Sequence, residues 1–299
     1  MIRKKRKLEV DLTPKIKKLE IITKGLVSNQ VQGRYQSVFK GRGLEFESYR
    51  PYAPDDDASM IDWKATAKGG QVLVKEYREE RNLNIFFLID ASDSMVFGST
   101  QKLKSEFAAE VVSSLAFTML EAGDKIGFAT FSDKITNINA PGDGKEKFFA
   151  LTRTLVDSEN YGGLFEFDTA AKFLLEYLKG ESLVIIVSDF VGLRENWTEH
   201  LKMAAKKFDI ICIMVRDPRD RTLPDERIQV MLADPYTKEK TIVDAKLIRE
   251  AYEEYVKRQE EEIGDTLRSL NVELLSISTD KPFIKPLMTF FNRRQRKWR

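Results

Sequence analysis

The stretch LNIFFLIDASDSMVFG, residues 83–98, contains an apolar run that ends in a carboxylate. The run Ile85–Ile89 is followed by Asp90, and two serines come next at alternate positions, Ser92 and Ser94. A continuous apolar run of this length is typical of a parallel strand that is buried on both faces. The sequence therefore predicts that a carboxylate and two hydroxyls leave the end of a buried strand together.

Further apolar runs follow this stretch and alternate with segments of helical periodicity. This alternation predicts an α/β domain with a doubly wound, mainly parallel sheet that helices cover on both faces. The predicted strands are 84–90, 125–131, 182–189, 209–215 and 271–278. The predicted helices are 102–122, 145–157, 168–178, 196–207 and 246–269.

Composition divides the chain into three parts. Residues 1–82 are expected to hold a basic N-terminal helix and a small β-rich region, because Gly, Pro, aromatic residues and short alternating segments gather there. Residues 83–284 are expected to form the α/β domain, with a loop and hairpin at 216–244 as an excursion. Residues 285–299 are expected to be a basic C-terminal tail.

The overall composition excludes several classes of protein. No apolar run approaches the roughly 20 residues of a transmembrane helix, and the basic start Met1–Lys7 is not followed by an apolar signal core. We therefore expect a cytoplasmic protein without a transmembrane segment. The single cysteine, Cys212, excludes an internal disulfide framework and a cysteine-based zinc cluster, and its apolar neighbours predict a buried strand position.

The formal net charge of +2 hides an uneven distribution. Residues 1–24 carry nine Lys and Arg against three acids, and residues 285–299 carry six with no acid, so the body between them is acidic. Basic ends could contact nucleic acid, anionic lipid or an acidic partner. Solvated termini are the simpler interpretation, because neither end interleaves its charges with aromatic residues as a base-stacking surface does.

Polar residues also follow other predicted strands. Asp189 ends the strand at 182–189, and a loop with paired glycines leads into the helix that contains Asp168 and Thr169. In an open parallel sheet, such loops meet beyond the carboxyl ends of the strands. Hydroxyls and few carboxylates suit Mg²⁺, which prefers oxygen ligands and keeps some of its water.

A structural role for the same loop is the competing interpretation. Ser92, Asp93 or Ser94 could accept hydrogen bonds from amides at the start of the helix at 102–122. Spacing alone does not separate a helix cap from a cation site.

The pattern Asp90-x-Ser92-x-Ser94 after an apolar strand resembles the metal-ion-dependent adhesion site of von Willebrand factor A domains. The chain also resembles the bacterial and archaeal family catalogued as domain of unknown function 58, from about residue 28 to its end. Four segments carry this second resemblance: GRGLEFESYRPYAPDDDASMIDWKATAK (41–68), EERNLNIFFLIDASDSM (79–95), AGDKIGFATFSD (122–133) and VIIVSDF (184–190).

The resemblance implies a von Willebrand factor A-like, Rossmann-like fold and a non-enzymatic adaptor that works with a MoxR-type AAA+ ATPase in protein assembly or remodelling. By the same resemblance, Asp90, Ser92 and Ser94 would be metal ligands from the first loop, and Asp189 would be the acid of the third loop. The cofactor would be Mg²⁺ or another divalent cation such as Mn²⁺. An acidic protein ligand would then bind through this ion.

One position departs from the family pattern. Related domains carry a threonine after the paired glycines, whereas Leu164 follows Gly162 and Gly163 here. Leucine has no oxygen with which to coordinate a metal. Thr169 and Asp168 are the candidates to replace the missing ligand.

The sequence contains few of the residue patterns that catalysis requires. His200 is the only histidine and lies on a predicted surface helix, without the partners of a catalytic triad. No phosphate-binding glycine loop is present, which argues against an independent ATPase. The remaining enzymatic alternative is a metal-dependent phosphoester hydrolase in which Asp93 or Asp189 activates water.

Overall fold

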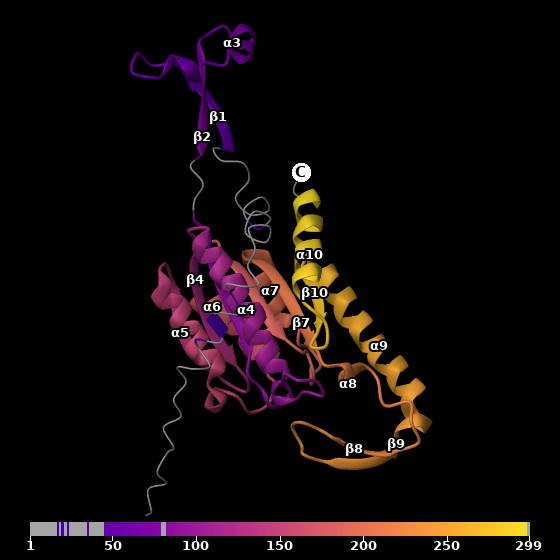
Figure 1. Cartoon of the computed structure of the whole chain (residues 1–299). Helices are drawn as coiled ribbons and strands as arrows, with labels where there is room; N and C mark the ends of the chain where they lie inside the picture. Colours follow the sequence, from indigo (N-terminus) through magenta and orange to yellow (C-terminus); the bar gives the residue numbers. More distant parts are fainter. Residues whose placement is uncertain are drawn as a thin grey trace, which may run out of the picture.

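A computed structural model describes residues 45–78 and 82–297, together with the isolated residues Lys17, Leu19, Glu20, Thr23 and Tyr35. The predicted basic N-terminal helix therefore lies largely outside the described residues. Within the described part, a six-stranded sheet with helices on both faces forms the centre of the molecule (Figure 1).

The central sheet has the strand order β10-β7-β6-β3-β4-β5, and only β5 runs antiparallel to its neighbour. The predicted doubly wound, mainly parallel fold is confirmed. The chain leaves β3 for β4 on one side and later returns to β6 on the other, so the strand order switches at β3. The strands are β3 Asn84–Asp90, β4 Lys125–Phe131, β5 Ile135–Gly142, β6 Leu183–Ser188, β7 Asp209–Arg216 and β10 Glu273–Ser278.

Different helices cover the two faces of the sheet. Because side chains alternate along a strand, Phe87 packs on one face of β3 and Phe86 on the other. The first face is covered by α4 Lys104–Glu121, α5 Lys145–Val156 and α10 Ile284–Lys297, and the second by α6 Phe167–Tyr177, α7 Glu199–Lys207 and α9 Ala245–Ser269. No helix among the described residues combines the length and the hydropathy that crossing a membrane requires.

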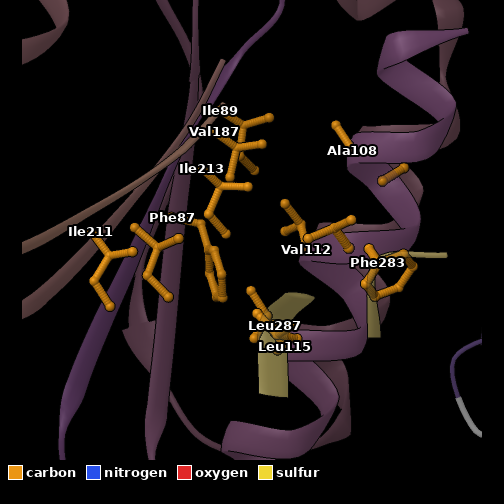
Figure 2. Close-up of a cluster of buried hydrophobic side chains, with 14 of the residues drawn as sticks. Phe87, Ile89, Ala108, Val112, Leu115, Val187, Ile211, Ile213, Phe283 and Leu287 are labelled. Atoms are coloured by element: carbon orange, nitrogen blue, oxygen red, sulfur yellow. The ribbon is translucent and has the colours of Figure 1, made fainter. Parts of the chain in front are cut away.

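The segment expected as a basic tail forms most of α10 and packs against the sheet. Figure 2 shows Phe283 and Leu287 beside Leu115 and Val112 of α4, opposite Phe87 of β3. The charged side of this helix is anchored as well, because the buried Arg294 pairs with Asp209 and Glu273. The C-terminal segment is therefore part of the hydrophobic core.

Two smaller units lie outside the central sheet (Figure 1). In the first, β1 Glu45–Pro51 pairs with β2 Leu73–Arg78, and α3 Trp63–Gly69 is part of the segment that connects the two strands. Asp62 caps α3 by accepting hydrogen bonds from two amides of its first turn. The second unit is a hairpin of β8 Gln229–Ala233 and β9 Lys240–Asp244, which precedes α9.

Replacing Phe283 by alanine should lower the free energy of unfolding by about 3–5 kcal/mol, because it leaves a cavity among buried side chains. The ring lies edge-on to Phe107 of α4, with 5.7 Å between centroids. Denaturant unfolding measures the change. Leu247→Ala is the control, since this leucine is 83% exposed and its loss should cost about 0.5 kcal/mol or less. Equally small losses in both variants would contradict the packing of Phe283, which directly precedes α10, against α4.

Candidate metal site at the carboxyl end of strand β3

Asp90 is the last residue of β3 and is fully buried. Its Oδ1 atom accepts a hydrogen bond from the Ser92 amide at 2.8 Å, and its Oδ2 atom accepts one from the Ser188 hydroxyl at 2.6 Å. Ser188 ends the neighbouring strand β6. Hydrogen bonds from two strand ends therefore fix the orientation of the Asp90 carboxylate.

The two serines of the motif direct their hydroxyls to the same place. Ser92 and Ser94 are buried, and a hydrogen bond joins their Oγ atoms at 3.2 Å. Ser92 precedes a short 3₁₀ helix, η2 Asp93–Val96, but its side chain makes no capping hydrogen bond. Helix α4 starts at Lys104, well beyond both serines. The helix-cap interpretation is therefore wrong for these hydroxyls.

Asp189 follows β6 and is also fully buried. Its Oδ1 atom accepts a hydrogen bond from the Val191 amide at 2.9 Å, and its Oδ2 atom accepts one from Lys104 Nζ at 2.7 Å. The same ammonium group lies 3.0 Å from the Asp220 carboxylate. A buried lysine thus bridges the acid of the third loop and a second acid from α8 Pro218–Arg221.

Sequence reasoning did not identify Lys104. It is the first residue of α4, only 1% of its surface is exposed, and nothing in its sequence neighbourhood marks it as functional. Burial alone would lower the pKa of the ammonium group, but the charges of Asp189 and Asp220 outweigh burial and raise it. Lys104 therefore stays charged and partly neutralises the site.

The electrostatics of the cluster favour an additional positive charge. Burial raises the pKa of Asp90 to about 7, and the nearby charge of Asp189 adds to this effect. The hydrogen bonds from Ser188 and Ser92 act in the opposite direction but do not cancel it. A cation near the serines would relieve the cost of ionising Asp90.

Gly162 and Gly163 lie in the loop that precedes α6, which is the second loop of the candidate site, and this loop is hydrogen-bonded to the first loop. The Gly162 amide donates to the Ala91 carbonyl at 2.7 Å, and the Asp93 amide donates to the Gly163 carbonyl at 3.0 Å. Gly163 has a φ of +96°, and a Cβ there would lie 2.6 Å from Asp133 Oδ1. Leu164 follows with its side chain 42% exposed, so the second loop brings an apolar group to the surface.

The two candidate replacements for the missing threonine lie on α6. Thr169 is exposed, and Asp168 pairs with His200 of α7, with 2.7 Å between Oδ1 and Nδ1. His200 is half-buried in this pair, although it was expected on an exposed surface. Within the described residues, no hydrogen bond joins Asp168 or Thr169 to the cluster of Asp90, Ser92, Ser94 and Asp189.

Another hydroxyl reaches the cluster from the loop between β8 and β9. The Tyr236 hydroxyl donates to the Val191 carbonyl at 2.8 Å and lies 3.4 Å from Ser92 Oγ. Burial, followed by the charge of Asp189, raises the pKa of Tyr236, so the phenol is neutral. The sequence predicts a hairpin in this excursion but gives no signal that its loop folds back onto β3.

The donor set is compatible with a hard divalent cation. No group of three or more His, Cys, Asp or Glu side chains that could hold a metal occurs in the part of the chain that the structure describes. The cluster instead combines two hydroxyls with two carboxylates, oxygen ligands that suit Mg²⁺ or Mn²⁺. Adjacent ligands of an octahedral Mg²⁺ lie about 3 Å apart. The 3.2 Å between the serine hydroxyls matches this spacing.

Residues 48–262 match the family described as "Protein of unknown function DUF58". The chain belongs to this family. "Uncharacterized protein Rv1480" of Mycobacterium tuberculosis is similar to this chain, with 25% identity over 291 residues that cover 95% of this chain and 90% of the relative. "Uncharacterized protein YeaD" of Bacillus subtilis is 31% identical over 108 residues, which are 36% of this chain and 25% of YeaD.

Solved structures also resemble this DUF58 chain. The conserved hypothetical protein BatB of Bacteroides thetaiotaomicron gives a TM-score of 0.46 at 14% identity, covering 72% of this chain and 100% of BatB. A von Willebrand factor type A protein of Catenulispora acidiphila gives 0.39 at 8% identity, covering 75% of this chain and 43% of that protein. The fold assignment rests on the strand pairing described above.

Replacing Lys104 by methionine should lower the free energy of unfolding by about 3–5 kcal/mol, because Asp189 would remain buried without its cation. Lys172→Met is the control. Lys172 pairs with Glu176 at 3.8 Å and both side chains are exposed, so its loss should cost about 1 kcal/mol or less. Chemical denaturation of both variants measures the difference, and similar losses would contradict the buried ion pair.

Asp90 should make stability fall as pH rises. Its folded-state pKa of about 7 exceeds the unfolded value of about 3.9, so between these values the folded protein keeps a proton that the unfolded chain has released. The contribution of Asp90 to the free energy of unfolding is therefore lost progressively through this window. Asp90→Asn removes the effect.

The measurement is urea unfolding at pH 5 and pH 8 with a chelator present. The free energy of unfolding of Asp90→Asn relative to wild type should be higher at pH 8 than at pH 5. An unchanged difference between the two proteins at the two pH values would show that burial does not raise the pKa of Asp90.

Proposed function

We propose that this protein is a non-enzymatic adaptor that binds a carboxylate of a partner protein through a divalent cation at Asp90, Ser92, Ser94 and Asp189. One observation carries the proposal: two buried serine hydroxyls without a capping role lie 3.2 Å apart beside two buried carboxylates. This cluster lies where the strand order switches, which is where α/β sheets bind ligands.

The protein's own residues would prepare the site for an acidic ligand. The serine hydroxyls would hold the cation, and Lys104 would neutralise part of the charge of Asp189. A bound cation would supply the positive charge that attracts an external carboxylate, since the hydroxyls are neutral and Lys104 already offsets part of the negative charge of the two acids. The buried carboxylates would then orient the site without filling it.

The rim of the site offers apolar contacts to a partner. Val96 and Phe97 follow the serines and are 49% and 43% exposed, and Leu164 lies on the adjoining second loop. Exposed apolar side chains around a polar centre are typical of protein-interaction surfaces. In this proposal, Leu164 replaces the family's metal ligand with a contact to the partner.

A MoxR-type AAA+ ATPase is the partner that the family resemblance suggests. The chain has no phosphate-binding glycine loop of its own, so ATP-driven remodelling would depend on another protein. We propose that the adaptor selects an acidic client while the ATPase supplies the energy.

Two alternatives have less support from the geometry. A hydrolase needs a free carboxylate to activate water, but Asp189 pairs with Lys104 and Asp93 pairs with Lys238. Nucleic-acid binding through the C-terminal segment would use its basic residues, yet Arg294 is buried in ion pairs. Neither alternative is therefore proposed here.

Calorimetric titration with MnCl₂ tests the proposed site. Wild-type protein should bind one Mn²⁺ ion, and Ser92→Ala or Ser94→Ala should weaken the affinity about tenfold or more, equivalent to about 1.4 kcal/mol. Thr169→Ala is the control and should bind as the wild type does, because this hydroxyl lies on the exposed side of α6. Binding that persists unchanged in both serine variants would place the ion elsewhere and overturn the proposal.

Capture of partners from a lysate tests the adaptor role. Wild-type protein should retain the same partner with Mg²⁺ present and lose it with chelator, and Asp90→Ala should not retain it under either condition. Equal capture by folded Asp90→Ala protein in chelator would mean that the partner binds independently of the site.

A further inference from the structure

The β8–β9 hairpin extends away from the central sheet and then turns back to it. Its strands pair with each other over five positions and with no strand of the six-stranded sheet (Figure 1). The connecting loop, residues 234–239, reaches the cluster at the end of β3. Tyr236, which is 144 residues further along the chain, therefore lies beside Ser92 of the motif.

The local structure of this loop presents Tyr236 to the site. The Asp234 carboxylate accepts hydrogen bonds from the Tyr236 and Thr237 amides at 2.7 and 2.8 Å, which fixes a tight turn. The Tyr236 hydroxyl then donates a hydrogen bond to the Val191 carbonyl. A phenol that donates in this way brings no negative charge to the cluster.

Two further features hold the loop against the site. Gly192 has a φ of +89°, and a Cβ there would lie 2.5 Å from Cε2 of Tyr236, so the glycine leaves room for the ring. Lys238 Nζ donates to Asp93 Oδ2 at 2.8 Å, and Asp93 lies between the two serines. The loop therefore contacts both the first and the third loop of the candidate site.

We infer that residues 234–239 are a built-in cover of the cation site, in which Tyr236 occupies the position that a partner's carboxylate must enter. This inference rests on the proposed function, because it concerns access to that same site. The hydroxyl and an external carboxylate cannot both lie beside Ser92. Binding of the partner therefore requires the loop to move away.

The contacts that hold the cover are few and partly exposed, so displacement is feasible. Among the described residues, the polar contacts that join the loop to the site are the hydrogen bonds of the Tyr236 hydroxyl with Val191 and Ser92 and the ion pair of Lys238 with Asp93, in which the lysine side chain is 64% exposed. The hairpin strands add little to the core, since Met231 and Ile242 are 60% and 68% exposed. Because only open molecules can bind, the apparent affinity of any ligand is reduced in proportion to the fraction of molecules that are open.

The test compares Mn²⁺ binding by wild-type protein and by the double variant Tyr236→Ala/Lys238→Ala, using Mn²⁺ alone as the probe. The double variant should bind Mn²⁺ about fivefold more tightly or better, since waters of the ion can then occupy the space of the phenol. Lys240→Ala, an exposed position in β9, is the control for loss of charge in the hairpin and should match the wild type. Circular dichroism verifies that both variants are folded.

Hydrogen exchange gives an independent readout. Addition of Mn²⁺ to the wild-type protein should accelerate amide exchange in residues 234–239 and leave exchange in β3 unchanged.

Adding Ser92→Ala to the double variant should abolish the gain in Mn²⁺ affinity, which locates the ion at the motif.

The outcomes separate the two proposals. If wild type and double variant bind Mn²⁺ equally through Ser92, or if the double variant binds more weakly, the cover is disproved and the cation site stands. If neither protein binds Mn²⁺, the cation site itself fails and the cover fails with it. Tighter binding by the double variant that is lost on adding Ser92→Ala would support both proposals.

Discussion

The burial of two carboxylates at neighbouring strand ends is the constraint on which the site depends. Asp90 and Asp189 have no exposed surface, and burying a charge is costly unless it is paired and hydrogen-bonded. Lys104 offsets that cost at Asp189, whereas Asp90 accepts hydrogen bonds from Ser92 and Ser188 and forms no ion pair with any of the described residues. The raised pKa of Asp90 expresses the remaining cost, which a nearby positive charge would lower.

The hydrophobic core and the site are built from the same elements. Strand β3 packs apolar side chains on both faces and delivers Asp90 at its end, and α4 packs against the sheet and supplies Lys104 from its first turn. The site geometry is therefore set by the packing of α4 on β3. The loop carrying Tyr236 is different, because it reaches the cluster from a hairpin whose strands lie outside the central sheet.

Local sequence patterns predicted what is local in the structure. The apolar runs at 84–90 and 125–131 coincide with β3 and β4, and the first-loop residues lie together because they are adjacent in sequence. Strand β5 was missed because ITNINAPG is half-exposed and contains no apolar run. The contacts of Lys104 and Tyr236 could not be predicted, because they depend on how distant segments fold back, and the charges of α10 concealed its buried face.

The central claim is that a divalent cation binds between the two serines and the buried acids. Anomalous diffraction from crystals of the wild-type protein soaked in MnCl₂ tests it most directly. The account predicts an anomalous peak bound by the hydroxyls of Ser92 and Ser94, with Tyr236 displaced from Ser92. A map without a peak at this position, from crystals in which Mn²⁺ occupies other sites or none, would contradict it.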